Sequence, residues 1–210
     1  MASNRGFDAE NSKSRAKLIE AAGAILSEDG HHAISARNVA ARAGLKPQLV
    51  HYYFRTMDDL MIAVFRAATE EYHAQHDAAL AGPFPLHAFW KLANNPFMTR
   101  RAMEFFALGN QREPIRAEIL LAAEHSRDHQ IAAVTRAFEE RGIESGLYTP
   151  TGFAMLMAAA ARALVMEQTL GISQGHAALR DMIEAFLDVI EPLAAAAAAT
   201  PDALVPQARA

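Results

Sequence analysis

The chain has 210 residues, of which 51% are hydrophobic, and its formal net charge is −4 at neutral pH. This length suits one or two domains with a sizeable core. The absence of cysteine excludes disulfide bonds, thiol catalysis and thiolate metal sites, and it is compatible with a reducing compartment. Residues 1–15 lack the apolar core of a signal peptide, and no apolar run is long enough to cross a membrane. We therefore expect a cytoplasmic protein with no membrane partner.

The charge is distributed unevenly along the chain. Residues 1–60 contain eight Lys and Arg against seven Asp and Glu, whereas residues 61–210 contain twelve against seventeen. Between Gly30 and Met57 the sequence has no acidic residue. Only the part of a protein that touches nucleic acid must approach phosphates, so a basic N-terminal region joined to an acidic body is compatible with such a partner.

An amphipathic helix opens the predicted fold. Residues 1–11 are polar, and we expect them to form a disordered tail. Apolar residues then recur every three or four positions, which predicts a helix from Asn11 or Ser12 to Asp29. The stripe that this helix would bury consists of Leu18, Ile19, Ala22, Ile25 and Leu26.

Two short helical patterns separated by a glycine lie within residues 34–59. Ser35 is a good cap for the first pattern, and Gly44 can take the left-handed conformation that ends it. Pro47 suits the first turn of a second helix, which we expect to run to Phe54. We call this second helix the reader. A helix, a short turn and a second helix form the helix-turn-helix unit, whose second helix enters the major groove of DNA. The alternative is an ordinary helical hairpin with a solvated basic face.

The segment around this unit resembles the tetracycline-repressor (TetR) family of bacterial transcription regulators. The resemblance covers about residues 14–67 and rests on S-A-R-N-V-A-A-R-A-G-L-K-P-Q-L-V-H-Y-Y-F, a polar turn and D-D-L. It implies an all-helical, homodimeric repressor with an N-terminal helix-turn-helix domain and a C-terminal helical domain that binds a small molecule and dimerises. One residue departs from the family pattern. Met57 stands where Lys often donates to a DNA phosphate, so that a charged contact is missing unless Arg55 replaces it.

The start of the second helix carries the residues that face the DNA bases in this fold. Gln can pair with adenine, Lys can donate to guanine, and Leu can pack on a thymine methyl group. Tyr hydroxyls suit phosphates, although an aromatic ring packed in a small core with a wet hydroxyl is the alternative. The residues that we expect to contact double-stranded DNA are Ser35, Arg37, Lys46, Pro47, Gln48, Leu49, His51, Tyr52, Tyr53 and Arg55.

A connecting helix and a proline-rich break follow the predicted reader. The pattern predicts a helix over residues 57–80, and the sequence A-G-P-F-P at 81–85 marks the expected hinge or linker to the body. We expect a DNA-binding domain at 12–56 and a ligand-binding and dimerisation domain at 57–199. A second disordered tail is expected at 200–210.

Residues 84–108 are dense in aromatic side chains and Met. Such residues at helical spacing usually form a core, but they also line apolar ligand cavities, and the sequence does not separate the two roles. Short helices are expected at 86–94 and 96–108, and a long one from about 112 to 141. With the family resemblance, we expect the ligand pocket to be lined by Phe89, Trp90, Phe97, Met103, Phe106, Ile119 and Met157.

Two pairs of histidines lie at helical spacing. His73 and His76 stand beside Asp77, and His125 and His129 form an i, i+4 pair. Either pair could hold a metal or respond to pH. A solvated or salt-bridged helix face is the commoner origin of such a pattern. We therefore predict no metal site and no cofactor.

Two helices close the predicted fold. The first spans about 149–171 and is apolar nearly all round, and the second spans about 173–198. Pairing with their copies in a second subunit would give a four-helix bundle, whereas burial within a monomer is the alternative. The resemblance, together with the need for a two-fold reader on a palindromic operator, favours the homodimer.

The sequence thus predicts an all-α, ligand-responsive transcriptional regulator, most often a repressor that a small, apolar effector molecule releases from its operator. It would act in the bacterial cytoplasm, on the nucleoid when bound to DNA. The alternative class is an enzyme or a small-molecule carrier. The sequence contains no G-x-S-x-G, no H-E-x-x-H and no glycine-rich phosphate loop, so we expect no catalytic residue. A carrier would leave the acid-free stretch unexplained, and the pattern does not decide between repression and activation.

Overall fold

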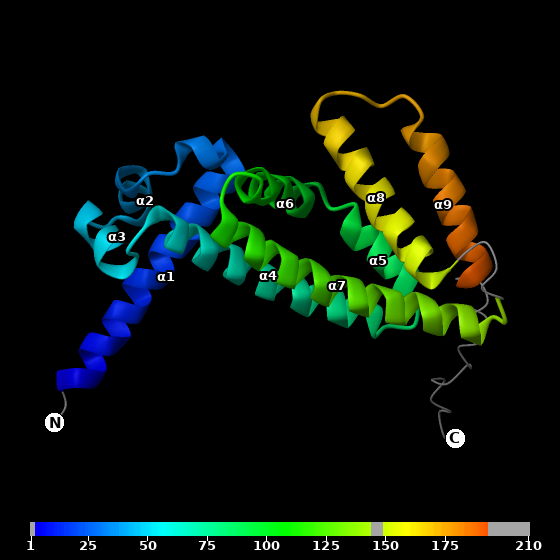
Figure 1. Ribbon diagram of the computed structural model, residues 1–210, viewed down its shortest axis with the longest axis horizontal. Coiled ribbons are helices and arrows are strands. Elements are labelled where there is room, and N and C mark those ends of the chain that lie inside the picture. Colours follow the sequence, from blue (N-terminus) through cyan, green and yellow to red (C-terminus); the bar gives the residue numbers. More distant parts are fainter. Residues whose placement is uncertain (1–2, 144–148, 193–210) are drawn as a thin grey trace, which may run out of the picture.

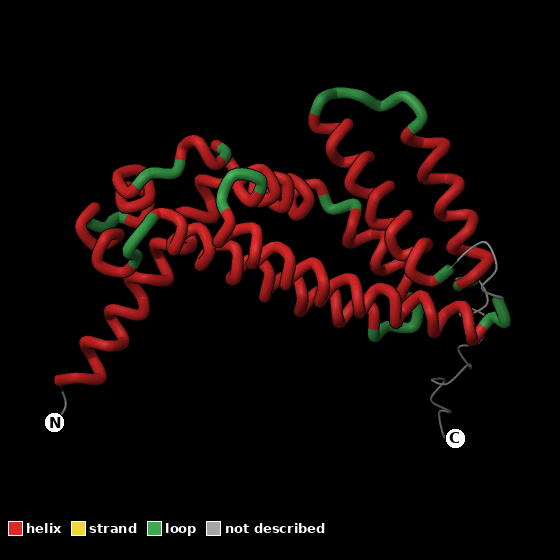
Figure 2. Tube along the Cα trace, viewed as in Figure 1, coloured by secondary structure: helices red, strands yellow, loops and turns green. Residues whose placement is uncertain are grey.

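The computed structural model describes residues 3–143 and 149–192, and within these ranges all regular elements are helical (Figures 1 and 2). In chain order they are α1 (Ser3–Asp29), the short 3-10 helix η1 (His31–Ala33), α2 (Ala36–Ala43), α3 (Pro47–Tyr53), α4 (Met57–Leu80), α5 (Pro85–Ala93), α6 (Pro96–Gly109), α7 (Glu113–Glu140), α8 (Pro150–Thr169) and α9 (His176–Ile190). The predicted all-α class is confirmed. No helix in these ranges has the length and hydropathy that crossing a membrane requires. The predicted tail at 200–210 lies outside the described residues.

Helix α1 begins at Ser3, well before the predicted start at Asn11 or Ser12. The expected disorder of residues 1–11 is therefore wrong for residues 3–11. Figure 1 shows the first turns of α1, in dark blue, projecting away from the other helices. Once a helix has nucleated on its packed part, each further residue adds one hydrogen bond at little cost. A helix that extends into solvent needs no apolar stripe, so periodicity could not reveal this extension.

The first of two cores holds the N-terminal helices together. Its buried residues on α1 to α4 are Leu18, Ala21, Ala22, Ile25, Leu26, Val39, Ala40, Val50, Leu60, Met61 and Val64, with Phe54 just after α3. Phe105, Leu108 and Ile115 complete it from α6 and α7. The core that supports α2 and α3 thus continues past the predicted domain boundary at residue 57.

The second core joins the end of α4 to α5, α7, α8 and α9. Its largest fully buried side chains are Leu86, Phe89, Phe138, Met157, Leu164, Leu187 and Ile190. A buried carboxylate connects α5 to the residue after α9. Glu191, after α9, accepts hydrogen bonds from the Leu86 N–H at 2.9 Å and the His87 N–H at 3.1 Å. The carboxylate thereby satisfies free N–H groups in the first turn of α5.

Helices α4 and α7 run parallel and side by side along the length of the molecule (Figure 1). Leu60, near the start of α4, belongs to the first core, and Leu80, at its end, belongs to the second. The Arg136 guanidinium of α7 donates to the Leu80 carbonyl at 3.0 Å and so caps the end of α4. Helix α4 therefore connects the two cores directly.

The break after α4 is a turn inside the body. The predicted interruption at 81–85 is present, and α5 begins at Pro85. However, Leu80 and Leu86 on its two sides pack in the same core. The interpretation of this segment as a hinge or linker is therefore wrong, because proline and glycine mark a change of chain direction whether or not the flanking elements share a core.

The last two helices are shorter than predicted. Helix α8 begins as expected, because the Thr149 hydroxyl caps it by accepting from the Gly152 N–H at 3.1 Å. Helix α9 begins only at His176, after Gly175 with a φ of 82°, and ends at Ile190. Residues 193–198, which the prediction included in this helix, lie outside the described residues.

Candidate functional site

Helices α2 and α3 have the geometry that their capping residues favour. The Ser35 hydroxyl accepts a hydrogen bond from the Asn38 N–H at 3.2 Å, which fixes the start of α2. Gly44 ends α2 with a φ of 66°, a left-handed conformation that other residues adopt with strain. Pro47 lies in the first turn of α3. The predicted helix, turn and second helix are all present.

Most of the residues predicted to contact DNA lie on an open surface. The exposed ones are Ser35, Arg37, Lys46, Pro47, Gln48, His51, Tyr52 and Arg55. Tyr52 is 66% exposed, although a Tyr ring usually buries much of its apolar surface. Val50 and Phe54 are buried and point inward, as predicted. One face of α3 therefore supports the fold, and the other is free for a partner.

Leu49 and Tyr53 differ from this group. Both are half-buried and pack against the first core. The Tyr53 ring also meets the Tyr52 ring edge-on, with 4.9 Å between ring centroids. For each tyrosine, the alternative to a phosphate contact was packing in a small core. Tyr53 is packed in this way. At Leu49 and Tyr53 only part of the side chain can reach DNA.

The cations around α3 divide into free and paired groups. Arg37, Lys46 and Arg55 form no ion pair within the described ranges, so their charges face solvent. Arg42 instead pairs with Glu28 of α1 at 2.6 Å. The free cations lie within the stretch of residues 30–57 that contains no acidic residue, which suits a phosphate backbone.

The N-terminus of α4 is closed by its own side chains. The Thr56 hydroxyl accepts from the Asp59 N–H at 3.1 Å, and the Asp59 carboxylate accepts from the Thr56 N–H at 3.0 Å. Asp58 pairs with Arg112 at the start of α7. Met57, which replaces the family's Lys, is half-buried and packs against the first core. Arg55, the predicted replacement for this Lys, is exposed.

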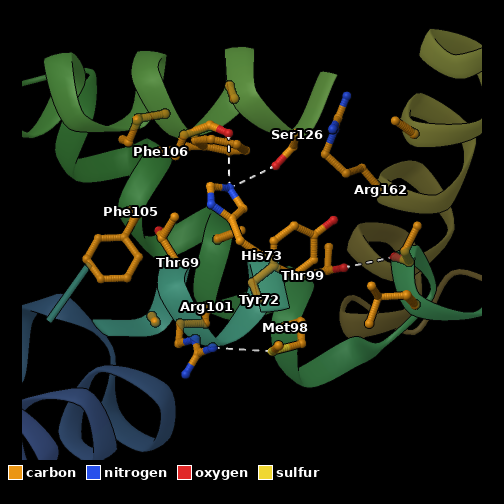
Figure 3. A pocket seen from close by; sticks show the side chains of 18 of the residues that line it. Thr69, Tyr72, His73, Met98, Thr99, Arg101, Phe105, Phe106, Ser126 and Arg162 are labelled. Carbon is orange, nitrogen blue, oxygen red and sulfur yellow. Dashed lines mark hydrogen bonds between the residues drawn. The ribbon is translucent and has the colours of Figure 1, made fainter. Parts of the chain in front are cut away.

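A second candidate site is a cavity of about 220 Å³ among helices α4 to α8. Figure 3 shows its lining, with Phe105, Phe106 and Tyr72 among the labelled rings. His73 and Ser126 are polar residues of the lining, and the His73 Nε2 lies 3.1 Å from the Ser126 hydroxyl. Burial lowers the pKa of His73, and the neighbouring His125 lowers it further. The cavity is mostly apolar and lies directly against α4, the helix that enters both cores.

The cavity lining includes some of the residues that were predicted to form the ligand pocket. Phe89, Phe106 and Ile119 line the cavity. The predicted residues outside the cavity lining are Trp90, Phe97, Met103 and Met157. Neighbouring residues on a helix face different directions, so Phe89 reaches the cavity while Trp90 packs in the second core with Met157. Phe97 is 54% exposed and lies beneath the Arg101 guanidinium, and Met103 is half-buried.

Arginines form the polar end of the cavity, which the aromatic pattern did not reveal. Arg127 and Arg162 both line it, and the buried Nη1 of Arg127 has no hydrogen-bond partner. Burial lowers the pKa of Arg162, as does the like charge of Arg127, while Tyr72 opposes them. No Asp or Glu occurs among the lining residues that the structure describes. Both guanidiniums remain cationic at neutral pH, and neither has a carboxylate beside it in the lining.

Comparison with known proteins decides the family. Residues 18–64 match the family model described as bacterial regulatory proteins of the tetR family. The chain belongs to the TetR family. It is thus a helix-turn-helix, DNA-binding transcriptional regulator, and the predicted family is confirmed. A comparison with curated proteins finds no match.

Solved structures share the fold of this TetR-family chain over most of its length. A transcriptional regulator from Pseudomonas aeruginosa PAO1 has 22% identity and a TM-score of 0.66, covering 86% of this chain and 91% of its own. A TetR-family regulator from Rhodococcus sp. has 17% identity and a TM-score of 0.69, covering 85% and 99%. A regulator from Saccharomonospora viridis, solved in complex with choline, has 17% identity and a TM-score of 0.71, covering 82% and 96%. At these identities the likeness concerns the fold alone.

In this TetR-family protein one side-chain contact joins the N-terminal helices to α6, and another joins α4 to α7. His31, in η1, contacts Glu104 of α6, with 2.7 Å between Nδ1 and Oε2. Arg66 of α4 forms a two-pronged pair with Glu118 of α7 at 2.6 and 2.8 Å. The sequence predicts no role for His31, because its partner lies far along the chain. Nothing in the local pattern around either residue signals the contact.

The two histidine pairs, which the sequence placed on separate helices, come together between α4 and α7. The His129 Nδ1 donates to Asp77 Oδ1 at 2.7 Å, and the His76 Nδ1 lies 3.3 Å from the same oxygen. The rings of His73 and His125 lie 4.2 Å apart. Burial lowers the pKa of His76. The predicted solvated faces therefore form one cluster, in which His76 is fully buried.

Proposed function

We propose that this protein is a repressor that binds a palindromic operator as a homodimer and that an effector molecule releases from DNA. The observation that carries the proposal is the position of the cavity. Its lining includes Thr69, Tyr72 and His73 of α4, and the same helix contributes Leu60 to the core beneath α3. A ligand that favours one position of α4 would therefore favour one position of the reader.

The DNA contacts in this proposal come from the exposed face of α3 and its surroundings. Gln48 and Lys46 would read base edges in the major groove, and Arg37, Tyr52 and Arg55 would hold phosphates. Their exposure and the free charges of these cations support this assignment. Two such readers about 34–36 Å apart would engage successive turns of the groove on one face of the DNA.

Exposed apolar side chains on the last two helices support the dimer. The large ones on and between these helices are Met155, Leu156, Met166, Leu170, Ile172, Met182 and Val189, of which Val189 is 75% exposed. A surface of this kind is typical of a face that another protein covers. We propose that a second copy covers it, so that α8 and α9 of both subunits form a four-helix bundle. The two-fold axis would then pair the readers for a palindromic site.

The effector that best fits the cavity has an apolar body and an acidic group. Aromatic and aliphatic side chains surround most of the space, which suits the predicted apolar molecule. The arginines of the lining add a requirement, because the Nη1 of Arg127 is buried without a hydrogen-bond partner among the described residues and favours an anion. Arg127 and Arg162 would hold a carboxylate or phosphate group. Choline, the ligand of the Saccharomonospora viridis protein, is a cation, so the two pockets would differ in the charge that they select.

Release of DNA would follow from differential binding. A ligand can shift the balance between two shapes of the protein only as far as it binds one shape more tightly. Here the acid would favour a separation of α4 from α7 that moves the two readers out of register. The same arrangement could serve an activator if the ligand-bound shape were the one that bound DNA, but the commoner outcome in such families is repression. The site of action would be the nucleoid, in the cytoplasm.

A small-molecule carrier is the second candidate, supported by the same cavity. The two functions predict opposite salt dependence. DNA affinity falls steeply with rising salt because counterions are released from the phosphates, whereas an apolar ligand remains bound. We propose no enzymatic activity, since the polar groups of the cavity are suited to binding an anion.

The test of DNA binding is a fluorescence anisotropy titration against DNA flanking the protein's own gene. We expect saturable binding that Gln48→Ala and Tyr52→Ala each weaken and that the control Glu140→Ala, at the exposed end of α7, leaves unchanged. If no flanking DNA binds, the protein is refolded to strip any bound ligand and is used to select from random DNA. Failure of both steps would overturn the regulator and leave the carrier.

The test of the effector class compares octanoate with octanol in releasing bound DNA. We expect the acid to act at concentrations at least tenfold lower, and Arg162→Met to abolish this preference. Arg101→Met is the matched control, because Arg101 also lines the cavity but already lies 3.8 Å from Glu71. An alcohol as effective as the acid would overturn the anionic effector while leaving DNA binding intact.

A further inference from the structure

We propose that His76, Asp77 and His129 form a binding site for a divalent transition metal ion such as Zn²⁺, which joins α4 to α7. The site lies beside the effector cavity and is separate from it. Each residue offers one ligand atom, and these atoms all lie within 4.8 Å of one another. Two elements far apart in the sequence contribute, so the site exists only in the folded chain.

The spacing of the ligand atoms is close to what zinc requires. Asp77 Oδ1 lies 2.7 Å from His129 Nδ1 and 3.3 Å from His76 Nδ1. Tetrahedral zinc with N and O ligands at about 2.0–2.2 Å sets neighbouring ligand atoms roughly 3.3 Å apart. An ion would therefore replace the protons that now bridge these groups, with small side-chain movements.

His125 lies next to these three residues. His125 Nε2 lies 3.8 Å from Asp77 Oδ2, and the rings of His125 and His129 are 4.3 Å apart. His125 lies outside the group whose ligand atoms are all within 4.8 Å of one another, so its ring would have to move to complete a set of three imidazoles and one carboxylate. Without His125 a water molecule would complete the tetrahedron. Imidazole ligands select Zn²⁺, Ni²⁺ or Cu²⁺ over Mg²⁺ and Ca²⁺, which prefer oxygen.

Gln130, which contacts the proposed ligand His76, supplies an independent observation. Gln130 Nε2 lies 3.2 Å from His76 Nε2, whereas the buried Oε1 of Gln130 has no hydrogen-bond partner. When His76 binds a metal through Nδ1, its Nε2 carries the proton and needs an acceptor. Rotation of the Gln130 amide by half a turn would present Oε1 to that N–H. The metal-bound state thus gives a partner to an oxygen that lacks one here.

Such an ion would fix the distance between the two long helices. Asp77 belongs to α4, which begins in the core under α3, and His129 belongs to α7. Gln130 and His73, on the same two helices, also line the cavity. Metal occupancy would therefore bias the same helix pair that the proposed effector acts on, although metal binding itself does not depend on the proposed function.

The test is a titration of untagged full-length protein, stripped with chelator, using Co²⁺ as a spectroscopic probe and Zn²⁺ as competitor. We expect one Co²⁺ per chain, visible absorption bands of a tetrahedral ion, and their loss when Zn²⁺ is added. Asp77→Asn and His129→Gln should each weaken binding more than tenfold. Circular dichroism of each variant verifies that it is folded, as expected for two half-exposed side chains.

His31→Gln is the matched control, because His31 also pairs with a carboxylate at 2.7 Å but lies at Glu104, outside the cluster. We expect this variant to bind Co²⁺ like the unchanged protein. Binding that persists in both Asp77→Asn and His129→Gln would overturn the proposal. So would the absence of tetrahedral bands in the unchanged protein.

Discussion

The Glu104 carboxylate on α6 accepts two hydrogen bonds from His31, one from its backbone N–H at 3.1 Å and one from Nδ1 at 2.7 Å. This contact joins the turn after α1 to the body. Burial raises the pKa of Glu104, but the hydrogen bonds and charge of His31 outweigh it and leave the pKa below its ordinary value. The unfolded chain therefore binds the Glu104 proton more readily than the folded one.

Replacement of this carboxylate should have a pH-dependent effect. Because the folded pKa is depressed, the stabilisation is present above the ordinary pKa of 4.5 and is lost as pH falls below it. We expect Glu104→Gln to lower the free energy of unfolding by about 1 kcal/mol at pH 7. The difference should shrink at pH 4. Urea denaturation of both proteins at the two pH values measures it, and an equal difference at both would contradict this account.

Two glycines at positive φ allow a matched comparison. Gly44, between α2 and α3, has a φ of 66°, and Gly142, after α7, has a φ of 62°. An added Cβ meets nothing within 4 Å at either position, so only backbone strain should count. We expect Gly44→Ala and Gly142→Ala each to cost about 1 kcal/mol of stability. Only Gly44→Ala should also weaken DNA binding, because it changes the angle at which α3 is presented. Equal DNA affinity of the two variants would show that the turn at Gly44 does not determine the orientation of α3.

The Glu191 carboxylate, which caps α5, should stabilise the fold more than the exposed carboxylate of Asp188. Glu191 is 5% exposed, and its loss would leave the Leu86 and His87 N–H groups without an acceptor. We expect Glu191→Ala to lower the free energy of unfolding by about 2 kcal/mol. Asp188, which contacts only the His87 ring, has a side chain that is 61% exposed, and Asp188→Ala should cost less than about 0.5 kcal/mol. Thermal and urea unfolding compare the two, and similar losses would mean that burial of the cap contributes little.

A single cation on the reader should alter the salt dependence of DNA binding. Lys46 precedes α3, is exposed and forms no ion pair within the described residues. If each Lys46 of the dimer contacts one phosphate, Lys46→Ala should reduce the slope of log affinity against log salt by about 1.8, which is about 0.9 for each phosphate. Lys91→Ala, at an exposed position of α5, is the matched control and should leave the slope unchanged. A contact of Lys46 with a base edge alone would instead appear as relaxed sequence preference at constant slope.

The sequence predicted well the features that depend on neighbouring residues. Thr149 before Pro150, and Ser35 with Gly44, gave the limits of their helices because capping is a local matter of hydrogen bonds and dihedral angles. The inward positions of Val50 and Phe54 followed from helical periodicity in the same way. These signals need only a few residues of context.

Features that depend on distant residues were missed. The convergence of His129 on Asp77 joins two helices whose register no local pattern specifies. Pocket lining was predicted by residue type, which identifies apolar side chains but not their direction, so Phe89 and Trp90 were treated alike. Arg127 and Arg162 were not considered at all, since a lone arginine on a helix usually marks a solvated face. Their significance appears only when packing half-buries both and places them in the cavity lining without a carboxylate beside them.

The contribution of Phe105, Leu108 and Ile115 to the first core limits how this regulator can be recombined with others. Chimeras that exchange the DNA-binding domain at residue 56 would leave these three apolar side chains against a foreign surface. A transplant with a native interface must carry the corner between α6 and α7 along with α1 to α4. The unit of modular exchange in this protein is therefore discontinuous in the chain, and a new operator preference is more safely installed by substitution on α3 than by grafting.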